Sequence, residues 1–149
     1  MHKFVWAGVA TLALAGLAGP AMAAGAVIGQ VKTVAGQAFV LRDGGRVAAR
    51  PGDAVQEKDV LETGADGAIG VTFIDNSVFS SGPNSQVSLE EFSFDSSNFK
   101  GAMTSEVRRG TLTVVSGDIA RSTPGSMKVK TPTAIMGVRG TTFAVQVKP

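Results

Sequence analysis

The sequence predicts an all-β protein that forms a single domain of about ten to twelve short strands. Apolar residues alternate with polar ones over short runs, and no long run has the 3.6-residue period of a helix. Turn-forming residues, mostly Gly, Ser, Asn and Asp, separate these runs at intervals of roughly ten residues. Such a pattern is typical of a sandwich-like fold, a barrel or a twisted, solenoid-like stack, and the lack of a strict internal period argues against a regular β-helix.

The first half of the domain contains four expected strands, each ended by a turn signal. Asp43-Gly44-Gly45 and Pro51-Gly52-Asp53 combine glycine with acidic residues, which favours tight turns. We expect the strands over residues 27–34, 37–42, 47–50 and 59–63.

The clearest hairpin follows, with its first arm at residues 68–74 and its second arm at residues 78–81. Ile69, Val71 and Phe73 alternate with other residues in the first arm, so that they share one face. Asp75-Asn76-Ser77 forms the expected turn between the arms.

Residues 85–94 form the next expected strand, and its apolar side chains change phase halfway. Val87 and Leu89 lie on one face, whereas Phe92 has the opposite phase. A strand changes face only where an extra residue is inserted, so we expect a β-bulge or a bend near Glu90-Glu91. If this change leaves Phe92 outside, its ring becomes an exposed anchor for a partner. Otherwise Phe92 belongs to the core, as a phenylalanine in a strand usually does.

The remainder of the chain contains one expected loop and several short strands. Residues 95–104 are polar and poor in β-formers, so we expect a loop there and the most mobile part of the domain. Residues 106–115 predict one or two strands. After turns at residues 116–118 and 122–125, the segment 127–147 predicts short strands broken by proline and glycine.

The first 23 residues have the features of a secretory signal. His2 and Lys3 give a positive start, an uncharged apolar run follows, and Ala21-Met22-Ala23 matches the small-x-small pattern of a cleavage site. We expect export to the periplasm with cleavage after Ala23, which leaves an all-β domain over residues 24–149 with no segment inserted in the membrane. The alternative is that the apolar segment stays in place as an anchor.

The side chains that the expected mature domain lacks exclude most catalytic chemistry. The single His and the single Trp of the chain both precede residue 24, and the sequence has no Cys and no Tyr. A Ser-His-Asp triad, a Cys-His pair and a zinc site of nitrogen and sulfur ligands therefore cannot form. We expect no enzymatic activity, no metal site and no cofactor.

Two charge patterns have simple interpretations. Acidic residues gather between residues 53 and 66 without the spacing of an EF-hand loop, which predicts turn caps and solvated side chains instead of a calcium site. With Lys3 removed, the 14 basic side chains become 13 against 12 acidic ones. This balance gives no electrostatic footprint for nucleic acid or for an anionic membrane.

A glycine-rich motif near the end of the chain is the last candidate feature. Its spacing does not fit a phosphate-binding loop. We interpret Gly137, Gly140 and Thr141 as a structural turn or bulge that needs positive φ and close backbone packing. Arg139 either solvates this turn or uses its planar guanidinium to hold a carboxylate or to contact a partner.

Taken together, these motifs resemble the FecR domain family. The most specific matching segments are residues 63–89, with Thr63-Gly64 and Gly82-Pro83-Asn84-Ser85, and residues 129–143. The resemblance implies a periplasmic all-β module that takes part in protein–protein contacts. In iron-uptake regulators of this family the domain helps to relay the state of an outer-membrane receptor to a cytoplasmic sigma factor. We expect a stand-alone module here, so this relay is not carried over.

We therefore expect an exported, non-catalytic FecR-type protein-interaction module in cell-envelope signalling or regulation. Its partner, a protein of the envelope or membrane, would dock on exposed strand edges, loops or apolar anchors, with Arg139 and Phe92 as candidate contacts. The alternative is a periplasmic module that binds carbohydrate or another envelope polymer. Carbohydrate platforms usually rely on exposed aromatic rings, and the sequence has no Trp or Tyr after residue 23.

Overall fold

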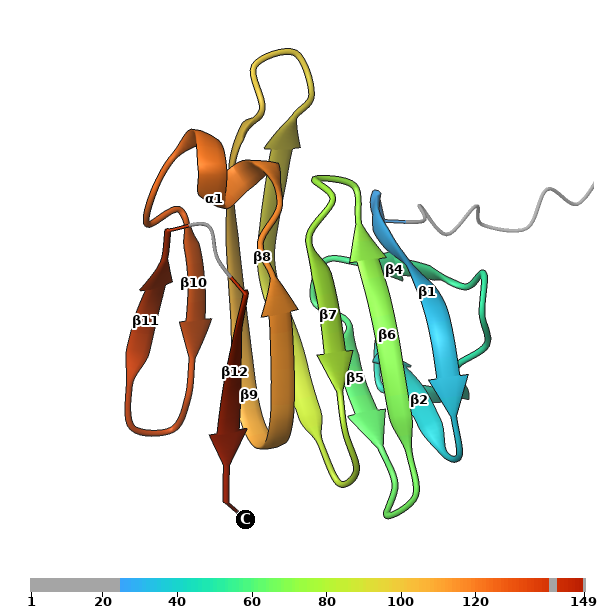
Figure 1. The fold of residues 1–149 in the computed structure, drawn as a ribbon. Coiled ribbons are helices and arrows are strands. Elements are labelled where there is room, and N and C mark those ends of the chain that lie inside the picture. Colours follow the sequence, from blue (N-terminus) through green and yellow to red (C-terminus); the bar gives the residue numbers. More distant parts are fainter. Residues whose placement is uncertain (1–24, 140–141, 149) are drawn as a thin grey trace, which may run out of the picture.

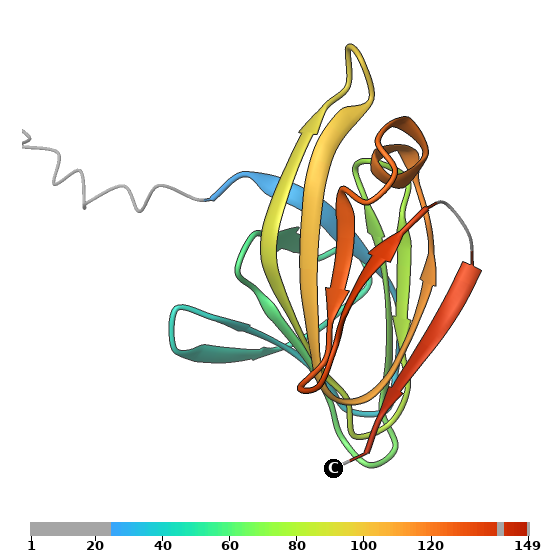
Figure 2. The ribbon, with the colours of Figure 1, turned by 90° about the vertical axis from the view of Figure 1, so that its left-hand side faces the viewer.

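The computed structural model describes residues 25–139 and 142–148, and it confirms the all-β class. Twelve strands form one sheet, which folds over so that its two halves face each other as two layers (Figures 1 and 2). The first layer contains β1 (Val27–Ala35), β4 (Ala54–Gln56), β6 (Ala68–Phe73), β7 (Val78–Ser81) and β12 (Thr142–Val147). The second layer contains β2 (Ala38–Arg42), β3 (Gly45–Ala48), β5 (Val60–Thr63), β8 (Gln86–Asp95), β10 (Met127–Lys130) and β11 (Ile135–Val138).

One long strand, β9 (Lys100–Val115), belongs to both layers. Its residues 100–109 pair with β8 in the second layer, and its residues 112–115 pair with β7 in the first. β7 and β8, which follow each other in the chain, thus pair with successive parts of β9, and all three strands take part in one bend. Figure 2 shows this bend as the curve that joins the layers. The neighbouring strands run antiparallel except β9 and β10, which run parallel. This pairing gives the sandwich-like arrangement and not the parallel coil of a solenoid.

Four corners of the chain, where it passes from one layer to the other, lie side by side and are hydrogen-bonded in series. We call them the corner row, which consists of residues 36–37, 63–67, 82–85 and 110–111. The Gly64 N–H donates to the Gln37 carbonyl at 2.8 Å, and the Asn84 N–H donates to the Gly64 carbonyl at 3.0 Å. The first three corners are therefore joined by the backbone itself.

Two buried hydroxyl groups complete the corner row. The Ser85 N–H donates to Thr63 Oγ1 at 2.9 Å, and Thr63 Oγ1 donates to the Gly82 carbonyl at 2.6 Å. Ser85 Oγ accepts the Thr111 N–H at 3.0 Å. Because Ser85 and Thr63 are buried, each lost bond would leave a polar group without water to replace it. These residues give the Thr-Gly and Ser-Gly-Pro-Asn-Ser segments a structural role.

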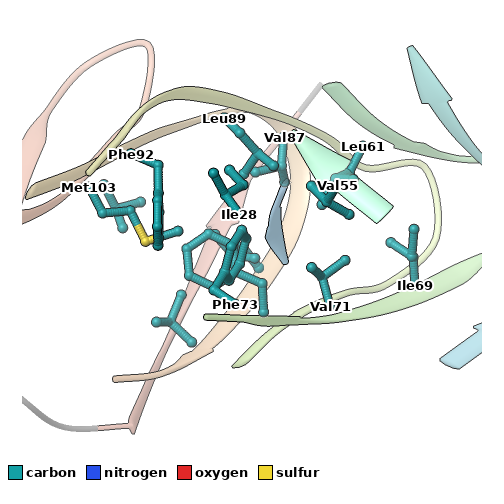
Figure 3. Packing of buried hydrophobic residues seen from close by; sticks show 14 of the residues in the cluster. Ile28, Val55, Leu61, Ile69, Val71, Phe73, Val87, Leu89, Phe92 and Met103 are labelled. Atoms are coloured by element: carbon teal, nitrogen blue, oxygen red, sulfur yellow. The ribbon is translucent and has the colours of Figure 1, made fainter. Parts of the chain in front are cut away.

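The core lies between the two layers, and Figure 3 shows its aromatic part. Phe73 packs edge-on against Phe79, with 4.8 Å between ring centroids, and stacks on Phe92 at 5.8 Å. Met103 lies opposite Phe92 in the β8–β9 pair and is also buried. Contacts of this kind carry the stability of a chain that has no cysteine.

The bulge expected near Glu90-Glu91 is present, because the register of β8 against β9 shifts between Leu89 and Glu91. The extra residue turns Phe92 back toward the core, where 8% of its surface is exposed. The expectation of an exposed ring at Phe92 is therefore wrong. A turn from the neighbouring strands secures the bulge, since the Phe92 N–H donates to Glu57 Oε2 at 2.9 Å.

The expected hairpin at residues 68–81 is confirmed. In the last strand, Phe143, Val145 and Val147 face the core and alternate with exposed residues. The expected loop at residues 95–104 is wrong in extent. β8 runs to Asp95 and β9 starts at Lys100, so that only residues 96–99 form the turn. Pairing across this hairpin outweighs the weak β-propensity of its residues. A short helix, α1 (Asp118–Ser122), replaces part of the turns expected after β9.

Gly110 marks the bend of β9 and gives the first testable prediction. Its φ is +86°, and a Cβ there would lie 2.4 Å from the Cα of Ser85. We expect Gly110→Ala to lower the free energy of unfolding by about 2 kcal/mol or more, measured by urea denaturation. Gly137→Ala is the matched control. Gly137 has an ordinary φ, and a Cβ added there would lie 3.7 Å from the nearest atom, which is ordinary van der Waals contact. Equal stability of the two variants would contradict the role of the corner row.

Candidate protein-interaction edge

Ionisable side chains in the part of the chain that the structure describes form no cluster with the spacing of a metal site. Within residues 25–139 and 142–148, no three His, Cys, Asp or Glu side chains lie close enough to hold a metal ion. The same residues contain no helix of the length and apolarity that a membrane span requires. The two ends of the sandwich differ in how well their strand edges are covered.

One end carries an ion pair between a buried carboxylate and a partly exposed arginine. Asp59 is fully buried, and its carboxylate accepts hydrogen bonds from Arg42 Nε at 2.8 Å, from Arg42 Nη2 at 2.6 Å and from the Gln56 N–H at 2.8 Å. The hydrogen bond to Asp59 raises the pKa of Arg42 above its usual value, against the opposing effect of burial. Arg42 Nη2 also donates to the Ala54 carbonyl at 3.2 Å. This pair ties β2 to β4 and to the turn before β5.

Some acidic residues at positions 53–66 cap turns, whereas Glu57, Asp59 and Glu62 bind groups that are distant in the sequence. Asp53 accepts the Arg50 N–H at 2.8 Å, and Asp66 lies 3.4 Å from the Gln37 N–H, as expected of turn caps. Asp59 is not the solvated side chain that the sequence predicts, because Arg42, 17 positions earlier, lies beside it. A pairing across strands at such a separation leaves no local pattern in the sequence.

The edge strand at this end is protected. β3 pairs with β2 on one side, and its Arg46 lies 3.7 Å from the centre of the Phe39 ring and 3.0 Å from Glu62. A charged side chain on an edge strand hinders the addition of further strands. A shallow groove of about 390 Å³ lies beneath the β2–β3 hairpin, lined mainly by Val40, Arg42, Val47, Ala48 and Ala54.

The opposite end of the sandwich is less well covered. β11 pairs with β10 alone and β12 pairs with β9 alone among the described strands, so that each layer ends in a strand with an unpaired edge (Figure 1). The side chains that these two strands turn toward the core are only half-buried, except for Val138: they are Met136, Phe143, Val145 and Val147. This end therefore offers both free backbone groups and apolar surface, which are the two elements of strand addition.

Charged and apolar side chains line the outer face of this end. Ile135 is 67% exposed, the largest exposed fraction among the large hydrophobic residues that the structure describes. Lys128 is exposed opposite Gly137 in the β10–β11 pair. Lys130 Nζ lies 3.0 Å from Glu90 Oε2. Side-chain contacts of Glu90 with the Glu106 carboxyl group and with Lys130 hold the pKa of Glu90 below its usual value.

The structure places the predicted site residues as follows. Arg139 directly follows β11, is exposed, and forms no ion pair with any acidic side chain that the structure describes, so its role as a partner contact stays a prediction. The prediction of a turn or bulge with positive φ at Gly137 is wrong, because Gly137 lies within β11 and has an ordinary φ. Gly140 and Thr141 lie outside the described residues. Phe92 is buried in the core and therefore cannot serve as an exposed anchor.

Sequence reasoning also missed a division of charge along the chain. From residue 119 onward the sequence contains basic side chains but no Asp or Glu; the basic residues are Arg121, Lys128, Lys130, Arg139 and Lys148. The near-zero net charge of the whole domain conceals this segregation. Counting charges by segment would have revealed it.

Comparisons with known proteins agree with the fold. Residues 59–149 match the FecR protein family, so the chain belongs to that family. The matched segment supplies the adjacent strands β5, β8, β9, β7 and β6, whereas β1 to β4 add pairs at both ends of this central part. No curated protein and no solved structure matches the chain. FecR proteins belong to regulation and signalling, and their domains are typically associated with the cell envelope.

The ion pair between Arg42 and Asp59 gives the second prediction. We expect Asp59→Asn to lower the free energy of unfolding by roughly 1–3 kcal/mol, because it leaves the charge of Arg42 without its partner; the partial exposure of Arg42 keeps the loss below that of a fully buried pair. Lys130→Met breaks the more exposed Lys130–Glu90 pair and should cost less than about 1 kcal/mol. Urea denaturation of both variants measures the difference. Equal losses would show that the burial of Asp59 has no energetic weight.

Proposed function

We propose that this chain is an exported, non-catalytic FecR-type module that acts in cell-envelope signalling by binding a partner protein. Membership of the FecR family supports the signalling role. The observation that supports protein binding most directly is the end of the sandwich at β11 and β12. There, apolar side chains that face the core remain half-buried beside two unpaired strand edges.

The compartment is part of the same proposal. The positive start, the apolar run and the small-x-small motif of residues 1–23 support export to the periplasm with removal of this segment after Ala23. The mature protein would then reach its partner from the periplasmic side and would not be inserted in the membrane.

Binding of carbohydrate or another envelope polymer receives less support. Such a site requires exposed rings, and Phe99 is the only phenylalanine among the described residues that ranks with the exposed large hydrophobic side chains. It lies in the β8–β9 turn with no second exposed ring to form a platform. Protein binding is therefore the function that the geometry favours.

Export gives the third prediction. We expect the protein recovered from the periplasmic fraction to have Ala24 as its first residue, because the cleavage motif ends at Ala23. Intact-mass measurement and N-terminal sequencing check this. A chain that keeps Met1 and sediments with the membrane would contradict the proposed compartment and favour the retained anchor.

Partner binding gives the fourth prediction. A photoreactive amino acid in place of Ile135 should form a covalent adduct of discrete size with an envelope protein in the producing cell, because this side chain projects beside the open end. Val47, 65% exposed against 67% for Ile135, is the matched control on the protected edge at the other end. Mass spectrometry identifies the adduct. Adducts of equal yield at both positions, or none at Ile135, would count against the proposed binding surface.

A further inference from the structure

We propose that the free edge of β11 accepts an acidic, extended segment of the partner protein as an added strand. By the free edge we mean the side of Ile135–Val138 that faces away from β10. This inference rests on the proposed function and specifies the edge that is used and the chemistry of the segment that binds. Four features of the described residues lead to it.

The first feature is the set of backbone groups that β11 leaves unpaired. In the turn before β11, the Thr131 N–H donates to the Ala134 carbonyl at 2.8 Å. Bonded and non-bonded pairs alternate along an antiparallel ladder, so Met136 and Val138 bond to β10. The N–H and C=O groups of Ile135 and Gly137 consequently point outward, where an added strand would pair with them.

The second feature is a glycine that the fold does not require. Each of the other described glycines either has positive φ or lies so close to its neighbours that an added Cβ would be 3.3 Å or less from the nearest atom. Gly137 has neither constraint, because its φ is ordinary and the nearest atom to a Cβ would be 3.7 Å away. A glycine in the interior of a strand weakens that strand unless a ligand or another backbone approaches it closely. At Gly137 the approaching backbone would be that of the added strand.

The third feature is the charge of this region. Lys128 and Arg139 are exposed at the two sides of Gly137, one across the pair and one following the strand. Lys130 is paired with Glu90, but neither Lys128 nor Arg139 forms an ion pair with an acidic side chain that the structure describes. A segment with carboxylates complements this charge, whereas a basic segment is repelled.

The fourth feature is the reach of Lys128 across Gly137. An added strand would lie about 10 Å from β10, twice the spacing of neighbouring strands. Because Gly137 has no side chain, Lys128 can extend over it toward a glutamate that lies opposite Gly137 on the added strand. Ile135 lies on the same face two positions away, opposite Lys130, and favours an apolar residue. The preferred segment thus has a carboxylate and an apolar side chain two positions apart.

The other described edges fit this role less well. β3 carries Arg46, which is engaged with Glu62 and Phe39. β4 has three residues, one fewer than β11, and none of them is an exposed large hydrophobic residue. β12 combines six residues with half-buried apolar side chains, but it has neither an unexplained glycine nor an exposed large hydrophobic residue.

The test uses the full exported chain, labelled with ¹⁵N, and two capped pentapeptides in a threonine background. One peptide has glutamate and valine two positions apart, and the other has lysine in place of glutamate. We expect the glutamate peptide to shift the amide signals of Ile135 and Gly137 and to bind about tenfold more tightly than the lysine peptide, with the difference falling as salt rises. Shifts centred on β3 or β12, equal binding of both peptides, or no binding would overturn the proposal.

Variants separate backbone pairing from charge. Gly137→Pro removes an outward N–H without removing a bond to β10, and it should abolish the shifts. A glutamate peptide with N-methylated backbone should also fail to bind, which tests pairing even if the proline variant does not fold. Lys128→Glu should reverse the preference toward the lysine peptide. Retained binding of the methylated peptide, or an unchanged preference in Lys128→Glu, would each disprove strand addition as proposed.

The outcome is distinguishable from that of the proposed function. An adduct at Ile135 together with no preference for the glutamate peptide would leave partner binding in place and remove only the acidic strand. If no adduct forms at Ile135 but the glutamate peptide still binds preferentially, the proposed binding of an envelope partner is wrong. The preference of the β11 edge for an acidic strand would then stand by itself.

Discussion

The structure depends on the hydrogen bonds that join successive corners of the chain. A sheet that folds over on itself must bring its backbone through tight bends, where strand pairing is interrupted and polar groups lie close to the core. Here the interrupted groups bond to the next corner, and the buried hydroxyls of Thr63 and Ser85 serve the places that the backbone leaves unpaired. The chain has no disulfide, so non-covalent contacts such as this row hold the two layers together.

Most of the corner row lies within the segment that matches the family. Residues 59–149 include three of the four corners and all the strands that surround β9. The four strands before residue 59 lie at the two ends of this central part, and the Arg42–Asp59 pair ties them to it. Because the sheet folds over at β9, these two outer strand pairs both lie at the same end of the sandwich, whereas the end formed by β11 and β12 stays open.

The sequence predicts those parts of the fold that local patterns determine. The hairpin of β6 and β7 follows from alternation around Asp75-Asn76-Ser77, and the bulge at Glu90 follows from a change of phase. The direction in which that bulge turns Phe92 depends on the register against β9, which no local pattern contains. The burial of Asp59 and the place of Gly137 on an edge likewise depend on partners that are distant in the sequence.

The candidate site consists of features that the fold itself does not require. Most described glycines are needed by bends or by close packing, and most inward side chains of the strands are covered. The remaining features lie together at β11. They are Gly137, which the fold does not need, the exposed Ile135, the unpaired backbone groups of β11, and basic side chains in a segment that has no Asp or Glu. Such features lower the stability of an isolated domain, since bare edges and exposed apolar groups gain nothing from water. Their concentration on β11 is therefore best explained by a strand that completes this end of the sandwich when the partner is bound.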